Sequence, residues 1–372
     1  MENFAKLAVD IFEGKAGKKV LFQPRINCWY DDKLFLHQPL PGGLDGMSKP
    51  EMYRALGVSN RLYEYNACFE RTYDKSVRPI WEDLGGGEYK QGFSTPLGEI
   101  YAVLRSNTSN PGMYYKKWMV ETAEDIRIAT YVEEASDYCY NPATYDALQR
   151  EWGDNGEPTM FICRTGIQEC FVTSMGVENT IYALQDERAL MEKYFDAIEK
   201  GQQPLLREIV KSPLRVINYG DNLHGGITSP ELYERYVIPV YARRYEILHP
   251  AGKFVHSHWD GDVASLLPFA QKSYLDGIEA LTPLPQGDVT VEQIYEALGE
   301  KQVLLDGIAA ILFHDNYPEE QLLAQAEQLI KLFAGRLILG ISDEMSSFGN
   351  IERVRLVRDY VNRYNASLEK NG

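Results

Sequence analysis

The stretch that decides the fold is residues 253–282, KFVHSHWDGDVASLLPFAQKSYLDGIEALT. Two short apolar segments, 253–259 and 277–282, carry polar residues toward their ends, and residues 262–271 between them have a helical pattern. A strand, a helix and a second strand in this order predict two parallel strands joined by a right-handed crossover.

The same alternation extends in both directions from this unit. Further strands are expected at 19–27, 159–164, 215–221, 302–307 and 336–343. Helices are expected at 229–248, 290–298, 318–333 and 350–365. Seven or eight such units close most naturally into a single (β/α)8 TIM barrel, which is an α/β fold.

The first part of the chain has a different character. Residues 1–20 have the pattern of an amphipathic helix, and residues 93–105 alternate with period two, which predicts an inserted antiparallel hairpin. The glycine-rich segment 85–92 follows no convincing strand and is read as a turn, not as a phosphate cradle. We therefore expect one barrel domain over 1–372. Its N-terminal helical extension and first strand lie in 1–150, and most of the barrel lies in 151–365.

Composition excludes several classes of partner. The 372 residues carry 38 Lys and Arg against 54 Asp and Glu, a net charge of −16. An acidic protein repels phosphate backbones and anionic bilayers, so we expect neither nucleic acid nor a membrane as a partner. Five irregularly spaced cysteines and the lack of a signal peptide favour a reduced, cytoplasmic protein.

The strongest chemical signal is the pair His256 and His258. Side chains two apart on a strand point to the same face, so both imidazoles can aim at one point. Glu279 lies inside the next apolar strand, and Asp343 and Glu344 end a later one. Two imidazoles and two carboxylates would make a four-ligand site for a divalent metal. The alternative is a set of hydrogen-bonded polar residues without a metal.

A second constellation is Asp221, Asn222 and His224, where a strand ends and a glycine-containing loop follows. Loops of this kind place polar groups over a pocket, which makes Asp221 a candidate general acid. Solvation of the loop and capping of the next helix explain the same residues equally well.

A third constellation lies on or just after the first predicted strand. Gln23, Arg25 and Asn27 alternate, so they share one face, and Tyr30 follows. An arginine there would bind a substrate carboxylate or phosphate through two parallel hydrogen bonds. The alternative is a buried structural ion pair.

Five stretches in order resemble the uroporphyrinogen decarboxylase superfamily. They are DNLHGGITSPELYERYVIPVY (221–241), GKFVHSHWDGDV (252–263), DGIEALTP (276–283), VLLDGI (303–308) and LILGISDEMSSFGNIERVRLV (337–357). The resemblance implies a (β/α)8 barrel preceded by helices. The decarboxylases of the superfamily are metal-free and carry two arginines in an early segment, where this chain has QPRINCWY (23–30) with one. That difference argues against a porphyrinogen substrate.

The other branch contains zinc methyltransferases, which move methyl groups between a corrinoid and a thiol or folate. In that branch the resemblance implies His-x-Cys at one strand end and a final Cys at the last, with a Glu between them in the distantly similar cobalamin-independent methionine synthases. Here His256 and His258 occupy the first position, Glu279 the second, and Asp343 or Glu344 the last. Imidazole and carboxylate are harder ligands than thiolate. A site in which they replace thiolates would suit Zn²⁺, Mn²⁺ or Fe²⁺, and zinc is the first expectation.

The resemblance therefore implies a metal-dependent methyltransferase that acts on methylcobalamin or a corrinoid protein, with a small-molecule methyl acceptor. Two alternatives stay open: a metal-free decarboxylase of a tetrapyrrole or other carboxylate that uses Arg25 and Asp221, and a non-catalytic barrel that binds a corrinoid or tetrapyrrole. Asn222 joins Asp221 and Arg25 as a candidate catalytic residue, while Gln23, Asn27, Tyr30 and His224 are candidate substrate-binding residues. A homodimer is left open as the oligomeric state.

Overall fold

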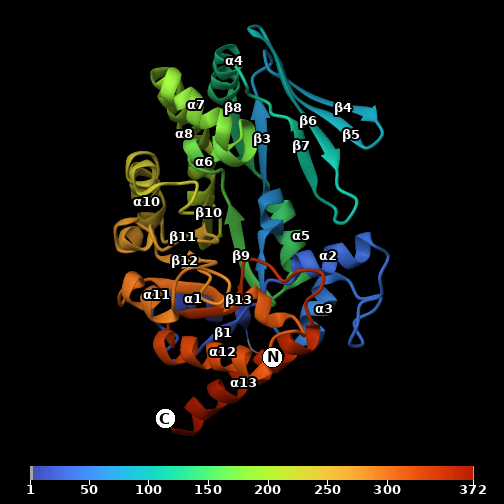
Figure 1. The fold of residues 1–372 in the computed structure, drawn as a ribbon, viewed down its shortest axis with the longest axis vertical. Helices are drawn as coiled ribbons and strands as arrows, with labels where there is room; N and C mark the ends of the chain where they lie inside the picture. The colour runs from blue at the N-terminus through green and yellow to red at the C-terminus, as the bar shows by residue number, and fades with distance from the viewer. Residues whose placement is uncertain (1–2, 372) are drawn as a thin grey trace.

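A curled sheet of eight parallel strands forms the centre of the protein (Figure 1). The computed structural model describes residues 3–371. The strands lie in the order β1-β14-β13-β12-β11-β10-β9-β2, and every neighbouring pair is parallel. Their bounds are Leu21–Phe22 (β1), Asn60–Leu62 (β2), Gly156–Phe161 (β9), Val216–Leu223 (β10), Phe254–Trp259 (β11), Gly277–Glu279 (β12), Val303–Ala309 (β13) and Leu337–Ser342 (β14). The predicted (β/α)8 barrel is confirmed.

The barrel closes between β1 and β2, the two ends of the strand order. The backbone N–H of Ser59 donates to the carbonyl of Phe22 at 3.1 Å. The side-chain amide of Gln23 donates to the Ser59 hydroxyl and to the Asn60 carbonyl, each at 3.2 Å. A side chain from the first strand region therefore supplies part of the bonding across this seam.

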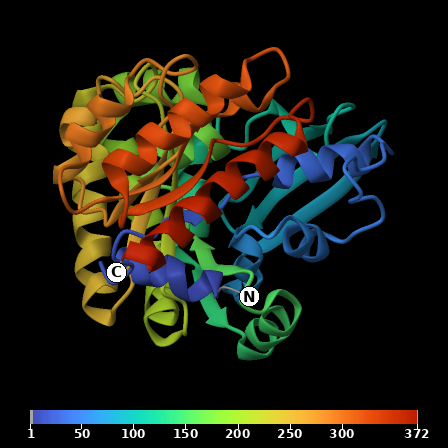
Figure 2. The same cartoon turned by 90° about the horizontal axis from the view of Figure 1, so that it is seen from below.

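The lower end of the barrel, where the strands begin, is plugged by α1 (Phe4–Phe12). Asn3 caps this helix by accepting from the backbone N–H of Lys6 at 2.7 Å. The apolar stripe of α1 packs with strand residues in a small separate core made of Leu7, Ala8, Ile11, Leu21, Val303, Leu305 and Ile338. Figure 2 shows this helix from below. The predicted N-terminal helix is thus confirmed over 4–12 but does not extend over 13–20, while residues 1 and 2 lie outside the described range.

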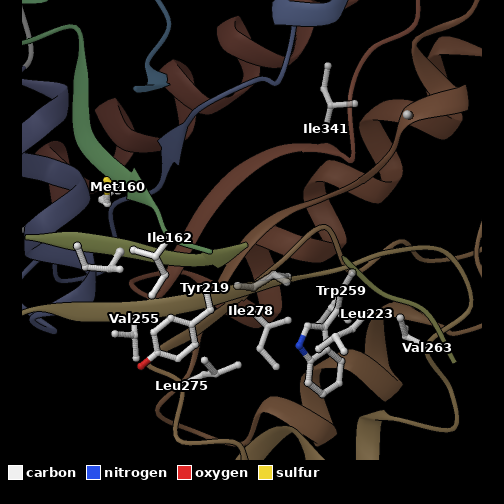
Figure 3. Close-up of a cluster of buried hydrophobic side chains, with 14 of the residues drawn as sticks. Met160, Ile162, Tyr219, Leu223, Val255, Trp259, Val263, Leu275, Ile278 and Ile341 are labelled. Atoms are coloured by element: carbon white, nitrogen blue, oxygen red, sulfur yellow. The ribbon is translucent and has the colours of Figure 1, made fainter. Parts of the chain in front are cut away.

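The main core lies between the sheet and the surrounding helices. Figure 3 shows part of it, with Tyr219, Val255, Trp259 and Ile278 among side chains from successive strands. The helices in contact with the barrel strands include α6 (Gly166–Glu169), α10 (Ile238–Leu248), α11 (Val291–Leu298), α12 (Glu319–Phe333) and α13 (Ile351–Asn371). The other α-helices are α2 (Asn27–Phe35), α3 (Lys49–Leu56), α4 (Ala123–Glu134), α5 (Pro142–Trp152), α7 (Val177–Asp186), α8 (Arg188–Lys211) and α9 (Pro230–Leu232).

Several helix connections are irregular. Short 3₁₀ segments are η1 (Tyr63–Cys68), η4 (His249–Ala251), η5 (Leu267–Lys272) and η6 (Ala310–Phe313), and π-helical turns are η2 (Cys170–Ser174) and η3 (Tyr233–Val237). The helix predicted over 229–248 is present, with η3 inserted between α9 and α10, and Ser229 caps it as expected. Among the helices of residues 3–371, none is long and apolar enough to cross a membrane.

An antiparallel sheet projects from the upper part of the molecule (Figure 1). It consists of β4 (Arg78–Gly85), β5 (Glu88–Thr95), β6 (Gly98–Ser106) and β7 (Met113–Lys117). A two-stranded ribbon of β3 (Phe69–Tyr73) and β8 (Ser136–Tyr140) lies beside it. The hairpin predicted over 93–105 is confirmed as part of β5 and β6. The turn predicted over 85–92 is limited to Gly86 and Gly87, because β4 runs up to Gly85 and residues 88–92 belong to β5.

Two local predictions were wrong, and one strand was missed. The strand expected over 19–27 shrinks to Leu21–Phe22, because Pro24 lacks an N–H for the ladder and α2 begins at Asn27. The helix expected over 262–271 is replaced by η5, because Pro268 disfavours helical backbone in the residue before it. Strand β2, which completes the barrel, was not predicted.

Candidate active site

A cluster of charged and polar side chains occupies the barrel where the strands end. His256 and His258 come from β11, Glu279 from β12 and Asp306 from β13. In the ladder, His258 pairs with Glu279, and Asn218 of β10 pairs with His256. The carboxyl ends of barrel strands are where enzymes of this fold place their catalytic residues.

Glu279 is the centre of this cluster and is only 1% exposed. One carboxylate oxygen accepts from Arg61, and the other accepts from Asn218 and lies 2.9 Å from Nδ1 of His258. His256 Nδ1 lies 3.2 Å from the first oxygen. Burial alone would raise the pKa of Glu279, but the charge of Arg61 and the contacts with the histidines outweigh it and hold the pKa well below its ordinary value. Glu279 is therefore a buried carboxylate anion.

Arg61 of β2 lies between two buried carboxylates. Besides Glu279, its guanidinium donates to both oxygens of Asp306, at 3.0 and 3.3 Å. Its Nε donates to the side-chain oxygen of Gln23 at 3.0 Å. Gln23, expected to bind substrate, therefore supports this arginine and the seam of the barrel.

Arg25 lies next to the same carboxylates but is partly exposed. Its Nη1 lies 3.7 Å from Glu279 and 3.9 Å from Asp306, and its Nε donates to Glu344 at 3.3 Å. Glu344 also accepts from the backbone N–H of Cys28 at 3.4 Å. The protein thus supplies carboxylate partners for Arg25 from its own chain.

The orientation of His258 follows from its contacts. Nδ1 lies 2.9 Å from Glu279 and 3.2 Å from Arg25. The shorter contact is with a carboxylate, which can only accept, so we assign the proton to Nδ1, with Arg25, which can only donate, at the longer distance. In the neutral ring the lone pair is then on Nε2, which lies 4.0 Å from an Asp343 oxygen.

His258, Asp260 and Asp343 form a group that can hold a metal ion. One donor atom from each lies within 4.8 Å of the others. Among the described residues, neither aspartate is ion-paired with a lysine or arginine. Partial burial, and next the charge of Asp260, raise the pKa of Asp343. A divalent cation would relieve this repulsion, and imidazole and carboxylate are ligands that zinc, manganese and iron accept.

Of the predicted ligands, only His258 and Asp343 belong to this group. His256 lies against Glu279, and Glu344 is bonded to Arg25. Glu279 has both oxygens engaged by Arg61, Asn218 and His258, and it lies against the ring nitrogen of His258 opposite the one that faces Asp343. Metal-binding histidines commonly donate their second N–H to a carboxylate in this way. The arrangement thus fits a metal at His258, Asp260 and Asp343, with Glu279 holding the imidazole in place.

Backbone strain coincides with this region. Ala280, Asp306 and Asp343 follow or lie in three consecutive strands, and all have positive φ, at 64°, 74° and 65°. Left-handed backbone costs about 1–3 kcal/mol for residues other than glycine, and it concentrates at functional sites. Other contacts must hold these residues in place, and for Asp306 the bonds with Arg61 do so.

Asp221 lies elsewhere, on the helix-facing side of β10. It accepts from the backbone N–H and the hydroxyl of Thr165, at 2.7 and 3.1 Å, and from the Tyr241 hydroxyl of α10 at 2.7 Å. Burial raises the pKa of Asp221 to about 6. Asn222 is exposed, and His224 accepts from the backbone N–H of Gly226 at 2.9 Å. These contacts hold the loop after β10.

The raised pKa of Asp221 gives a testable pH dependence. The folded form binds its proton up to a pH of about 6, whereas the ordinary value for an aspartate is 3.8. This group therefore stabilises the fold fully below that ordinary value, and its contribution is lost as pH rises through 6. In urea unfolding at pH 4, 5, 6 and 7, the wild type should lose stability relative to Asp221→Asn between pH 4 and 6. A difference that stays constant over this range would contradict the prediction.

The other two predicted substrate-binding residues make structural contacts. Asn27 accepts from the Tyr53 hydroxyl at 3.1 Å. Tyr30 is buried in the core, and its hydroxyl donates to the Met47 carbonyl at 2.9 Å. Within the described range 3–371, neither side chain forms a hydrogen bond with Glu279 or with the histidines.

Sequence reasoning missed Arg61, Asn218, Asp260 and Asp306. Asp306 could have been found, because it ends the apolar run VLLD as Glu279 does in its own strand. Asp260 follows the histidines directly in HSHWDGD. Arg61 gave no signal of this kind, since β2 is only three residues long.

No family model matches the sequence, and no curated protein is found as a relative. Among solved structures, a methyltransferase from Methanosarcina mazei matches with a TM-score of 0.60 and 10% identity, over 97% of this chain and 98% of the other. A putative vitamin-B12-independent methionine synthase from Listeria monocytogenes has a TM-score of 0.43 at 16% identity, over 62% of this chain and 71% of that one. A B12-independent methionine synthase from Shewanella sp. W3-18-1 has a TM-score of 0.46 at 11% identity, over 95% and 98%. The first of these shows that the fold is shared over nearly the whole of both chains.

Proposed function

We propose that this protein is a metal-dependent methyltransferase that moves a methyl group between a corrinoid and a thiol or folate acceptor. The observation that carries the proposal is the orientation of His258, with Nδ1 on Glu279 and Nε2 toward Asp343. The likeness in fold to a protein named as a methyltransferase supports the reaction class. The corrinoid, free as methylcobalamin or carried by a partner protein, comes from the sequence resemblance described above.

In this proposal His258, Asp260 and Asp343 hold a divalent cation, with zinc as the first candidate. Such a cation lowers the pKa of a bound thiol and so supplies thiolate near neutral pH. The chain's own residues do the rest. Glu279 keeps the proton on Nδ1 of His258, and Arg61 and Asn218 keep Glu279 in place. Asp343, whose side chain is 49% exposed, leaves one side of the site open to the acceptor.

The decarboxylase alternative is not proposed. It requires Arg25 to grip a substrate carboxylate and Asp221 to act on it. Arg25 instead has Glu344 as its partner, and Asp221 is bonded to Thr165 and Tyr241 on the helix-facing side of β10.

The test combines metal content with a transfer assay. Protein purified without a histidine tag or chelator should contain about one equivalent of divalent metal by mass spectrometry. With methylcobalamin and candidate acceptors (homocysteine, other small thiols, tetrahydrofolate), demethylation should be visible by absorbance. Asp260→Asn and Asp343→Asn should lower metal content, and Glu124→Gln, an exposed carboxylate on α4, should not. Protein that takes up no metal even from added zinc would contradict the metal site. Turnover of uroporphyrinogen would contradict the methyltransferase proposal and favour the decarboxylase alternative.

A further inference from the structure

Asp343, one of the three proposed metal ligands, lies where the chain turns sharply. It is the first residue after β14, and its φ of 65° is in the left-handed region. Aspartate adopts this backbone more readily than most residues other than glycine, but the strain must still be offset by neighbouring contacts. The position of this ligand therefore depends on the residues on either side of it.

On the N-terminal side, Ser342 fixes the end of β14. It is fully buried, and its hydroxyl donates to the Leu281 carbonyl and accepts from the backbone N–H of Gly307, both at 3.0 Å. Leu281 follows β12, and Gly307 lies in β13. The chain that enters the turn at Asp343 is thus bonded to two neighbouring segments of the barrel.

On the C-terminal side, Glu344 and Met345 bind to the segment that follows β1. One oxygen of Glu344 accepts from Nε of Arg25 at 3.3 Å, and the other accepts from the backbone N–H of Cys28 at 3.4 Å. The backbone N–H of Met345 donates to the Arg25 carbonyl at 2.9 Å, and Met345 is fully buried. Arg25 therefore bonds to both residues that follow Asp343.

Arg25 is itself held from the other side by the buried ion pairs. Its Nη1 lies 3.7 Å from Glu279 and 3.9 Å from Asp306, and Arg61 donates to both of these carboxylates. The side chain of Arg25 is 14% exposed. The bond between Arg25 and Glu344 thus connects the loop after β14 with the fixed charged cluster inside the barrel.

The two adjacent carboxylates have different partners. An Asp343 oxygen lies 4.0 Å from Nε2 of His258, whereas Glu344 bonds to Arg25 and is not part of the group that can hold a metal among residues 3–371. Burial raises the pKa of Asp343, and the charge of Arg25 partly offsets this rise, so the arginine attracts that carboxylate as well. Because Glu344 occupies Nε of Arg25, the arginine competes less with a metal for Asp343.

We propose that Glu344 is a positioning residue, which holds the loop after β14 on Arg25 and so keeps the Asp343 carboxylate directed at a metal bound also by His258 and Asp260. Loss of a residue that supports a metal ligand typically lowers metal affinity about 10- to 100-fold. The inference rests on the metal site of the proposed function, and it gives Glu344 a role other than that of a ligand.

Zinc affinity of the full chain, measured by isothermal titration calorimetry, tests this role. Glu344→Ala should weaken zinc binding about tenfold or more. Glu344→Gln loses the charge but keeps an oxygen that can accept from Arg25, so it should retain most of the affinity. If Glu344 were a ligand or acted only through its charge, glutamine would cost as much as alanine, and that result would overturn the proposal.

A double-mutant cycle tests whether Glu344 acts through Asp343. Asparagine tolerates left-handed backbone as aspartate does, so Asp343→Asn weakens the ligand without changing the turn. In the Asp343→Asn protein, Glu344→Ala should cause little further loss of zinc affinity. An equal loss in both backgrounds would show that Glu344 acts independently of Asp343 and would overturn the proposal.

Glu133→Ala is the matched control, because Glu133 has a similar exposure, 14% against 20% for Glu344, and pairs with Arg71 outside the site. Its zinc affinity should equal that of the wild type. Urea unfolding of the metal-free proteins checks the fold, and Glu344→Met, which has a similar length and no acceptor oxygen, is measured in parallel and should behave as Glu344→Ala does.

The outcomes separate this inference from the proposed function. Zinc binding that depends on Glu344, in a protein that transfers no methyl group, would refute the proposed function and leave the inference intact. Methyl transfer by a wild type whose Glu344→Ala variant binds zinc equally well would refute the inference alone. A wild type that binds no zinc would contradict both.

Discussion

Replacing Arg61 with methionine is expected to lower the free energy of unfolding by about 3–5 kcal/mol, the usual cost of removing one partner from a buried ion pair. Arg61 is only 3% exposed and bonds to Glu279 and Asp306, which are also buried. Methionine has a similar length but no charge, so two carboxylates would share the interior with Arg25 as the nearest cation. Urea unfolding at pH 7 measures the loss.

The control is Arg127→Met, which removes an exposed pair on α4 and should cost no more than about 0.5 kcal/mol. A triple variant that adds Glu279→Gln and Asp306→Asn should regain much of the stability, because no uncompensated charge is then buried. If Arg61→Met alone costs less than about 1 kcal/mol, the ion-pair network is not what holds this end of the barrel.

Replacing His258 with alanine is expected to weaken metal binding by at least about 100-fold. That is the upper end of the loss seen when only a residue behind a metal ligand is removed, and His258 is the proposed ligand itself. Methyl transfer should fall with metal content, while the fold should persist because the core lies between the sheet and the helices. Metal content by mass spectrometry and far-ultraviolet circular dichroism measure the two effects.

His249→Ala provides the comparison, because His249 is exposed at the end of α10 and lies 3.6 Å from Asp276, outside the site. It should keep its full metal content. A His258→Ala protein that still holds one equivalent of metal would show that the ligands are elsewhere.

The long elements of the fold were predictable because each carries its own pattern. The α11 segment has a capping box between Thr290 and Gln293, and its buried residues Val291, Ile294 and Leu298 recur with helical spacing. The strands β1 and β2 have no such signature. β1 has two residues and β2 has three, and they exist because the neighbouring strands of a closed barrel offer them hydrogen bonds.

Some residues of the candidate site were also predictable from local sequence, and others were not. His256, His258 and Glu279 stood out because polar side chains in apolar strands are costly to bury without partners. The partners themselves were not predictable, since Arg61 lies 218 residues from Glu279 along the chain. Local sequence therefore identified which side chains need a partner, and only the closed barrel shows which residue satisfies each of them.

Side chains of the charged cluster form hydrogen bonds across the seam between β1 and β2. Gln23 reaches across to Ser59 and Asn60, and Arg61 holds Gln23 on one side and Glu279 on the other. The hydrogen bonds that close the barrel between β1 and β2 therefore involve the same residues as the ion pairs that hold Glu279. We therefore expect a ligand that stabilises the charge on Glu279 to slow the opening of the barrel between β1 and β2, and the exchange rates of amide protons along these strands to report on occupancy of the site.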